Sequence, residues 1–295
     1  MPHSSRKKHP SQAQSHKRLE ITDSSGWTHV TTGGNARRLL RHNHHQTTPR
    51  HDSEPQREPE KENQQLQPDS RAVLTPAEAP PNVTLEQLKR QLHTYRTRWE
   101  QSAAFTQVQQ GLSRLGLHEN NTGAFKEDGR IVCIGLGSPS GFLRGGWVDR
   151  RSVSMYQLAA LASIMDWIGE LSHPVSREKH QSNRISVFAQ DPVFNAHDIS
   201  LLASLDITVL EHPVAFEKVS AQTLLFAPGA ERTHLEQLLA HNPAVVFGGP
   251  LEEIESEVVK RFVQSRDSVQ LPLFAEQEHA FWKMRVYYPR TEKGD

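Results

Sequence analysis

The first periodic pattern along the chain predicts an amphipathic helix that begins after Thr84. Thr84 is a suitable N-cap, Gln87 completes a capping box, and Val83 occupies the position of a hydrophobic staple. The apolar face of this helix is formed by Leu85, Leu88, Leu92, Tyr95 and Trp99. We expect the helix to continue past Leu112 to a stop at Gly116 and to pack on a sheet. A coiled coil is the alternative, but the stripe runs through few heptads.

From Arg130 onward, short apolar runs alternate with helical segments. The predicted strands are 131–134, 185–189, 207–210, 223–226 and 244–247, and a last apolar run, 281–288, is expected to be an edge strand. The predicted helices between them are 154–168, 197–205, 231–240 and 251–264. Strands that alternate with helices build a parallel sheet with crossover helices. The sequence therefore predicts an α/β domain over residues 84–290, a Rossmann-like, doubly wound and mostly parallel sheet.

A polar tail, residues 1–80, precedes this domain. It is rich in Ser, His, Gln, Pro, Arg and Glu and has few apolar residues to bury, so we predict that it is disordered. Residues 26–31 form a small island around Trp27 that either docks on the domain as a short strand or floats with the tail. The tail histidines His42, His44 and His45 lack a fixed geometry, so no metal site is predicted.

Charge and cysteine content limit the cellular compartments and the classes of partner that we expect. Lys plus Arg and Asp plus Glu are equal at 34 each, so no net field favours nucleic acid or an anionic membrane as a partner. Cys133 is the single cysteine, which excludes a disulfide within the chain. The basic N-terminus is followed by no apolar run, and no stretch has the length of a membrane span. We therefore expect the cytoplasm, the nucleus or both.

The loop after the first strand is the first candidate binding site. Ligands of open parallel sheets bind beyond the carboxyl ends of the strands at the switch point. Here Gly135, Gly137 and Ser138 begin a loop, 135–141, in which glycines allow close approach of a ligand and a following helix favours negative charge. The G-x-G pattern is incomplete, because position 140 is Ser. The loop is either a nucleotide-type site or a tight turn that packs helix on strand.

Three further residues are candidates for the same site. Asp191 follows the second strand, where an acidic residue often holds a ribose; its alternatives are a helix cap or the Asp–Pro turn. Arg144 and Trp147 lie in an insert after the first loop and could bind a phosphate or carboxylate and stack on a base. The alternative for the insert is a solvated loop.

The chemistry of catalysis is not visible in the sequence. Cys133 lies inside an apolar strand, where burial raises the pKa of its thiol, so it is not a nucleophile. The chain has no nucleophile elbow, zinc spacing or P-loop. No catalytic residue is assigned.

In combination, four segments resemble the SRR-like (sensitivity to red light reduced) family. They are 131–138 (IVCIGLGS), 154–159 (SMYQLA), 190–194 (QDPVF) and 223–230 (TLLFAPGA), and the resemblance covers about residues 84 to 290. It implies a regulatory role of the kind known for members in light signalling, circadian or stress-type regulation, with unidentified protein partners and no transferable catalytic residues. Many members carry Met-Pro-His-Cys where this chain has 227–230 (APGA), so it resembles a divergent, fungal-looking member.

Three functions follow from these observations. The first is a regulatory protein, with or without a nucleotide-like ligand at the 135–141 loop. The second is an S-adenosylmethionine-dependent methyltransferase-like enzyme, with S-adenosylmethionine or another nucleotide as cofactor. The third is a ligand-free protein-interaction domain whose glycines only make turns.

Overall fold

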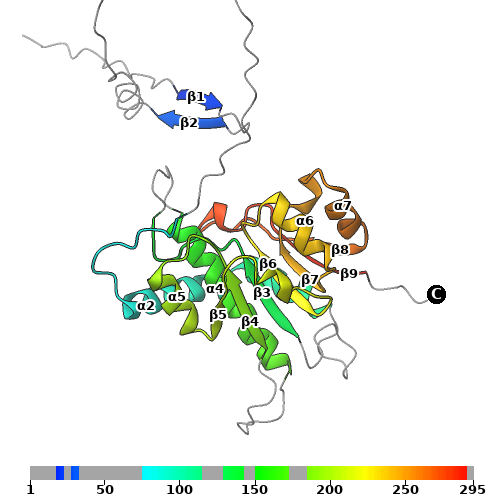
Figure 1. Cartoon of the computed structure of the whole chain (residues 1–295), viewed down its shortest axis with the longest axis horizontal. Helices are drawn as coiled ribbons and strands as arrows, with labels where there is room; N and C mark the ends of the chain where they lie inside the picture. Colours follow the sequence, from blue (N-terminus) through cyan, green and yellow to red (C-terminus); the bar gives the residue numbers. More distant parts are fainter. Residues whose placement is uncertain are drawn as a thin grey trace, which may run out of the picture. The chain divides into compact units, whose positions relative to one another are not determined.

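The computed structural model describes residues 18–22, 28–32, 75–114, 129–142, 150–172 and 185–290. The chain divides into two units, Met1–Asp69 and Ser70–Asp295. In the first unit, β1 (Arg18–Thr22) and β2 (Thr28–Thr32) form an antiparallel pair (Figure 1). The sequence indicated one strand in this unit, within the island 26–31, which overlaps β2. Trp27 lies outside the described residues. Docking of that island stays a prediction.

The second unit is built on a seven-stranded sheet in the order β5-β4-β3-β6-β7-β9-β8. The strands that run parallel to one another are β3 (Arg130–Ile134), β4 (Ser186–Gln190), β5 (Ile207–Val209), β6 (Thr223–Ala227) and β7 (Val245–Gly248). The antiparallel strands are β8 (Arg266–Gln270) and β9 (Arg285–Pro289). The predicted α/β class and mostly parallel sheet are therefore confirmed.

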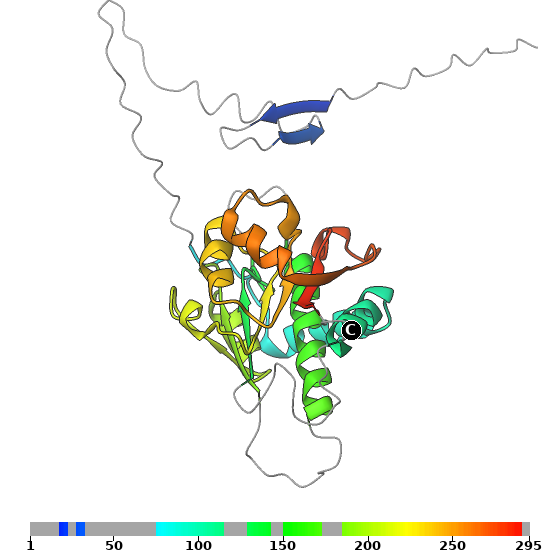
Figure 2. The ribbon, with the colours of Figure 1, turned by 90° about the vertical axis from the view of Figure 1, so that its right-hand side faces the viewer.

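Helices cover both faces of the sheet (Figure 2). One face packs on α2 (Leu85–Glu100), α3 (Ala103–Ser113), α4 (Arg151–Ser172) and α5 (Ala196–Ala203). The other packs on α6 (Arg232–Ala240), α7 (Glu257–Gln264) and the short 3-10 helix η1 (Phe216–Lys218). In β3, Ile131 and Cys133 join the first core, whereas Val132 and Ile134 join the second. This alternation explains why the sequence shows an unbroken apolar run, since both faces of the strand are buried.

The long helix predicted after Thr84 is two helices. The predicted capping box is present, because Gln87 N–H donates to Thr84 Oγ1 at 3.2 Å and Thr84 N–H donates to Gln87 Oε1 at 2.9 Å. The helix ends at Glu100, and Ser102 caps α3 by accepting the Phe105 N–H at 3.1 Å. Trp99 is fully buried just before this break, against Phe105, Phe274 and Phe281. The apolar stripe continues across the break, and so its spacing does not reveal the bend.

The C-terminal part of the sheet also differs from the prediction. Segment 251–264 is divided into a 3-10 helix, η2 (Leu251–Glu253), and α7. β9, which was predicted to be an edge strand, lies inside the sheet between β7 and β8. The edge at this end of the sheet is β8, a strand that the sequence analysis did not predict. β8 reads RDSVQ and is only partly buried, so it lacks the apolar pattern by which a strand is recognised.

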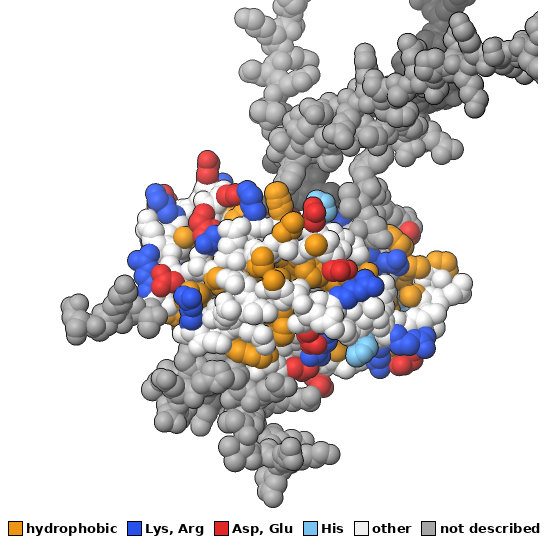
Figure 3. All heavy atoms as spheres, turned by 180° about the vertical axis from the view of Figure 1, so that it is seen from behind, with side chains coloured by type: hydrophobic (Ala, Val, Ile, Leu, Met, Phe, Trp, Pro, Cys, Tyr) orange, Lys and Arg blue, Asp and Glu red, His pale blue; other side chains and the backbone are white. Residues whose placement is uncertain are grey.

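The surface carries charges of both signs. Figure 3 shows acidic and basic side chains interspersed on one face, with hydrophobic side chains gathered between them. None of the helices in the described segments is both long enough and apolar enough to cross a bilayer.

Candidate functional site

The candidate site lies at the carboxyl edge of the parallel strands, where the strand order reverses. From β3 the chain proceeds to β4 and β5 on one side, and then returns to place β6 and β7 on the other. The loops that follow β3 and β6 are consequently neighbours at the switch point, the usual position of ligand sites in open α/β sheets. We call this region the switch-point site and define it by Gly135, Gly137, Asp191, His212 and His234.

Glycine allows the first two loops to touch. Gly135 has a φ of +75°, a left-handed conformation that other residues adopt at a cost. A Cβ atom on Gly135 would lie 2.4 Å from the carbonyl carbon of Gly229, and one on Gly229 would lie 2.5 Å from the Gly135 oxygen. The backbones after β3 and β6 are therefore in direct contact.

Asp191 fastens the β3 loop to the end of β4. Its Oδ2 accepts the Gly137 N–H at 2.8 Å, and its Oδ1 accepts the Val193 N–H at 3.0 Å. The second bond orders the turn at Pro192, which was one of the alternatives predicted from the sequence. The structure thus brings Gly135, Gly137 and Asp191 together, and a role for them in ligand binding stays a prediction.

A second carboxylate, Asp198, accepts hydrogen bonds from the rest of the 135–141 loop. Asp198 is fully buried in the first turn of α5. It accepts hydrogen bonds from Ser138 Oγ at 2.6 Å, from Ser140 N–H at 2.9 Å and from Asn195 N–H at 3.1 Å. The sequence analysis did not single out Asp198; the capping-box spacing of Asn195 and Asp198 was the available signal. Ser138, a predicted ligand residue, is buried in this network.

The electrostatics of the site centre on Asp191. Burial raises the pKa of the Asp191 carboxyl, and the nearby charge of Asp198 raises it further. The two backbone hydrogen bonds and His234 act in the opposite direction, and the net effect is an increase. A half-buried carboxyl with a raised pKa at a switch point is a candidate functional group.

Two histidines that the sequence analysis missed complete the site. His212 follows β5, and His234 lies in the first turn of α6; their ring centroids are 6.0 Å apart, and both rings contact Phe216. Gln190 Oε1 accepts the Ala215 N–H at 3.0 Å, so its amide group faces His212 Nδ1, also at 3.0 Å. Nδ1 is then the acceptor, which leaves Nε2 of the neutral ring as a donor.

The remaining predicted residues divide into two groups. Arg144 and Trp147 lie outside the described residues, so their predicted roles stay predictions. Cys133 is fully buried, and burial raises the pKa of its thiol, in accord with the expectation that it is inert. Leu136 is also buried, between the two loop glycines. In the described segments, no group of three or more His, Cys, Asp and Glu residues could hold a metal ion.

Comparison with known proteins gives one strong match. The model of the SRR1 domain family matches residues 89–288, which include every residue of the switch-point site. No curated protein matches the chain. The crystal structure of Thermoplasma acidophilum 1320 is similar to this fold; the alignment covers 69% of this chain and 98% of that protein, with 9% sequence identity and a TM-score of 0.32. A likeness at that level supports no conclusion about function.

Proposed function

Because the chain belongs to the SRR1 domain family, we propose that it is a regulatory protein whose switch-point site binds a small, nucleoside-like ligand. The ligand would be held through hydroxyl or amino groups. The observation that carries this proposal is that the Asp191 carboxyl lies within electrostatic range of His234, whose ring centroid is 6.0 Å from that of His212. The three residues follow three different strands, β4, β5 and β6.

The hydrogen bonds of the loop argue for hydroxyl or amino groups over phosphate. A phosphate cradle needs free backbone N–H groups. Here the N–H of Gly137 is bound to Asp191, that of Ser140 to Asp198, and that of Gly141 to Ser138 Oγ at 2.9 Å. The same two carboxylates bring negative charge to the loop, which opposes an anionic ligand. The loop is therefore better suited to support the site than to bind a phosphate.

The side chains around the loop supply the complementary chemistry. Asp191 keeps acceptor capacity beyond its two backbone bonds, because each carboxylate oxygen has two lone pairs. His212 offers a donor at Nε2, and the ring of Phe216 lies beside both imidazoles. A ribose or an amine would meet the carboxylate, and a flat base could stack on the rings.

Calorimetric titration of the full-length chain tests this proposal. The ligands are adenosine, S-adenosylmethionine and S-adenosylhomocysteine on one side, and AMP, ADP and ATP on the other. We expect micromolar binding within the first group and weaker binding with each added phosphate. The S-adenosyl compounds also examine the methyltransferase alternative, since tight binding of both would justify a search for a methyl acceptor.

Matched histidine variants locate the binding. His234→Ala should abolish it, whereas His241→Ala, at the C-cap of the same helix and exposed, should leave it unchanged. Binding of ATP stronger than that of adenosine would contradict the proposed chemistry. A folded protein that binds none of the six compounds would leave the family membership intact and remove the ligand.

A further inference from the structure

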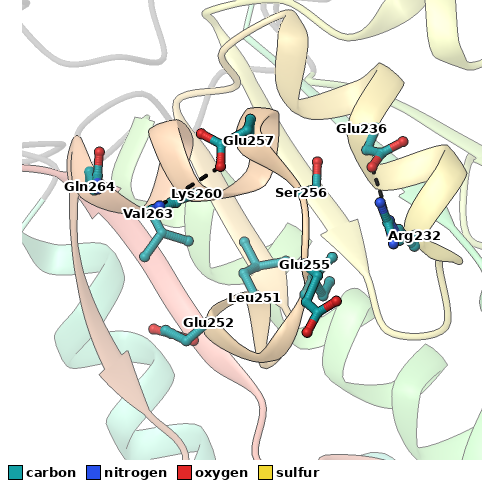
Figure 4. A pocket seen from close by; sticks show the side chains of 11 residues that line it. Arg232, Glu236, Leu251, Glu252, Glu255, Ser256, Glu257, Lys260, Val263 and Gln264 are labelled. Atoms are coloured by element: carbon teal, nitrogen blue, oxygen red, sulfur yellow. Dashed lines mark hydrogen bonds and ion pairs between the residues drawn. The ribbon is translucent and has the colours of Figure 1, made fainter.

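A groove on the sheet face that α6 and α7 cover has different lining residues from the switch-point site, although His234 lies between Arg232 and Glu236 on α6. It lies between α6 and α7, has a volume of about 730 Å³, and shares no residue with that site (Figure 4). Its lining residues come from α6, η2, α7 and the connection between the last two; they are Arg232, Glu236, Leu251, Glu252, Ile254, Glu255, Ser256, Glu257, Lys260, Val263 and Gln264. We call it the α6–α7 groove.

The groove has an apolar floor and an acidic rim. Leu251 is buried, and Ile254 and Val263 are half-buried; all three belong to or pack against the core on this face. Figure 4 shows Leu251 between acidic side chains, with Glu252 and Glu255 on one side and Glu257 on the other. An apolar floor with a charged rim is the arrangement of many peptide-binding surfaces.

Most rim charges are already held in place. Arg232 pairs with Glu236 at 3.0 Å, and Lys260 pairs with Glu257 at 3.8 Å. Hydrogen bonds from Arg232 and Ser256 lower the pKa of Glu236, so it is ionised at neutral pH. Four carboxylates against two cations leave the lining with a charge of minus two.

Of the two carboxylates that make up this excess, Glu252 is already paired outside the lining and Glu255 is not. Glu252 is fixed by the hydroxyl of Tyr287, which donates to its Oε2 at 2.6 Å, and by Arg285 at 3.3 Å. Glu255 is exposed, and among the described residues it forms no ion pair. A cation that enters the groove from solvent would therefore meet Glu255 without breaking an existing pair.

We propose that the α6–α7 groove binds a short basic segment of a partner protein, with Lys or Arg at the acidic rim and an aliphatic side chain on the floor. Charge complementarity selects the basic residues, and the floor of Leu251, Ile254 and Val263 selects the aliphatic anchor. This surface also supplies a location for the protein partners expected of a regulatory protein.

Fluorescence anisotropy of the full-length protein with labelled peptides tests the inference. The first peptide carries lysines and leucines at helical spacing; the second replaces lysine by glutamate, and the third replaces leucine by serine. We expect the first to bind, with an affinity that falls as salt is added, because exposed charges are screened. The other two should bind at least about tenfold more weakly. Spermine, a cation without an anchor, should not compete at the peptide's concentration.

A matched pair of charge reversals assigns the binding to the groove. Glu255→Lys should weaken the first peptide by about tenfold, since reversal replaces an attraction by a repulsion. Glu217→Lys changes another exposed carboxylate, on η1 and outside the lining of the groove, and should have no effect. Equal binding of the glutamate peptide, equal binding by spermine, an unaffected Glu255→Lys variant or no binding at all would each overturn the inference. Adenosine binding should be unchanged in Glu255→Lys, which separates this result from a failure of the proposed function.

Discussion

Substitution of Gly135 by alanine tests the close approach of the two switch-point loops. Gly135 adopts a φ of +75°, and an alanine there costs about 1–2 kcal/mol in backbone conformation alone. Its Cβ would lie 2.4 Å from the Gly229 carbonyl carbon and 2.7 Å from the Ala230 nitrogen. Because these atoms are backbone, a loop must move, and such overpacking costs roughly 1–3 kcal/mol. Gly135→Ala should therefore lower the free energy of unfolding by about 2–5 kcal/mol.

Two other glycines calibrate this value. Gly229→Ala meets the same contact from the other side, with a Cβ 2.5 Å from the Gly135 oxygen, but its φ is not left-handed. It should lose only the overpacking part, about 1–3 kcal/mol. Gly169 is exposed in α4 with nothing within 4 Å of a new Cβ, so Gly169→Ala should stabilise the protein by about 0.5–1 kcal/mol.

Urea unfolding followed by circular dichroism measures all three variants in the full-length chain. The order of stability should be Gly169→Ala, wild type, Gly229→Ala and Gly135→Ala. In a thermal melt followed by the same signal, the midpoint temperature of Gly135→Ala should fall by about 4–20 °C. If Gly135→Ala unfolds within about 0.5 kcal/mol of the wild type, the loops can separate without cost, and the contact does not shape the site.

Two carboxylates give further predictions. Asp198→Ala leaves the N–H groups of Ser140 and Asn195 without their acceptor in a buried site. It should therefore lower the free energy of unfolding, measured in urea, by about 3 kcal/mol or more. The control Asp267→Ala, at an exposed position, should lower it by less than about 0.5 kcal/mol. Burial raises the pKa of the Asp191 carboxyl in the folded protein above its value in the unfolded chain, so ionisation of this group lowers the stability of the fold. The loss is absent below about pH 4, where the carboxyl is protonated in both states. It grows as the pH rises toward the raised pKa and is complete above it. Wild type should therefore lose stability relative to Asp191→Asn as pH rises; the opposite trend would show that the hydrogen bonds outweigh burial.

Elements with a strong local pattern were predictable from the chain alone. The buried strands β3, β6 and β7 appear as apolar runs, and the start of α2 appears in the capping box of Thr84 and Gln87. The boundary between α2 and α3 and the polar edge strand β8 were missed, because a break that keeps the apolar stripe and a strand without one leave no periodic signal.

The candidate site divides along the same line. Gly135, Gly137 and Asp191 could be found because the strand pattern places the ends of β3 and β4 at one edge of a parallel sheet. His212 and His234 could not, since their neighbourhood depends on how η1 and α6 fold back over that edge. Likewise, Asp198 looks like an ordinary helix-cap residue until its contacts with Ser138 and Ser140 are seen.

The sequence by itself determined the α/β class, the order of the five parallel strands along the chain and the family. These are properties of local periodicity and of short motifs, which depend on residues close in the chain. Only the tertiary structure decided which strand forms the edge, which amides of the 135–141 loop are already bound, and that four carboxylates line a groove over an apolar floor. Those facts rest on contacts between distant residues, because long-range packing, not local preference, selects the partner of each buried polar group.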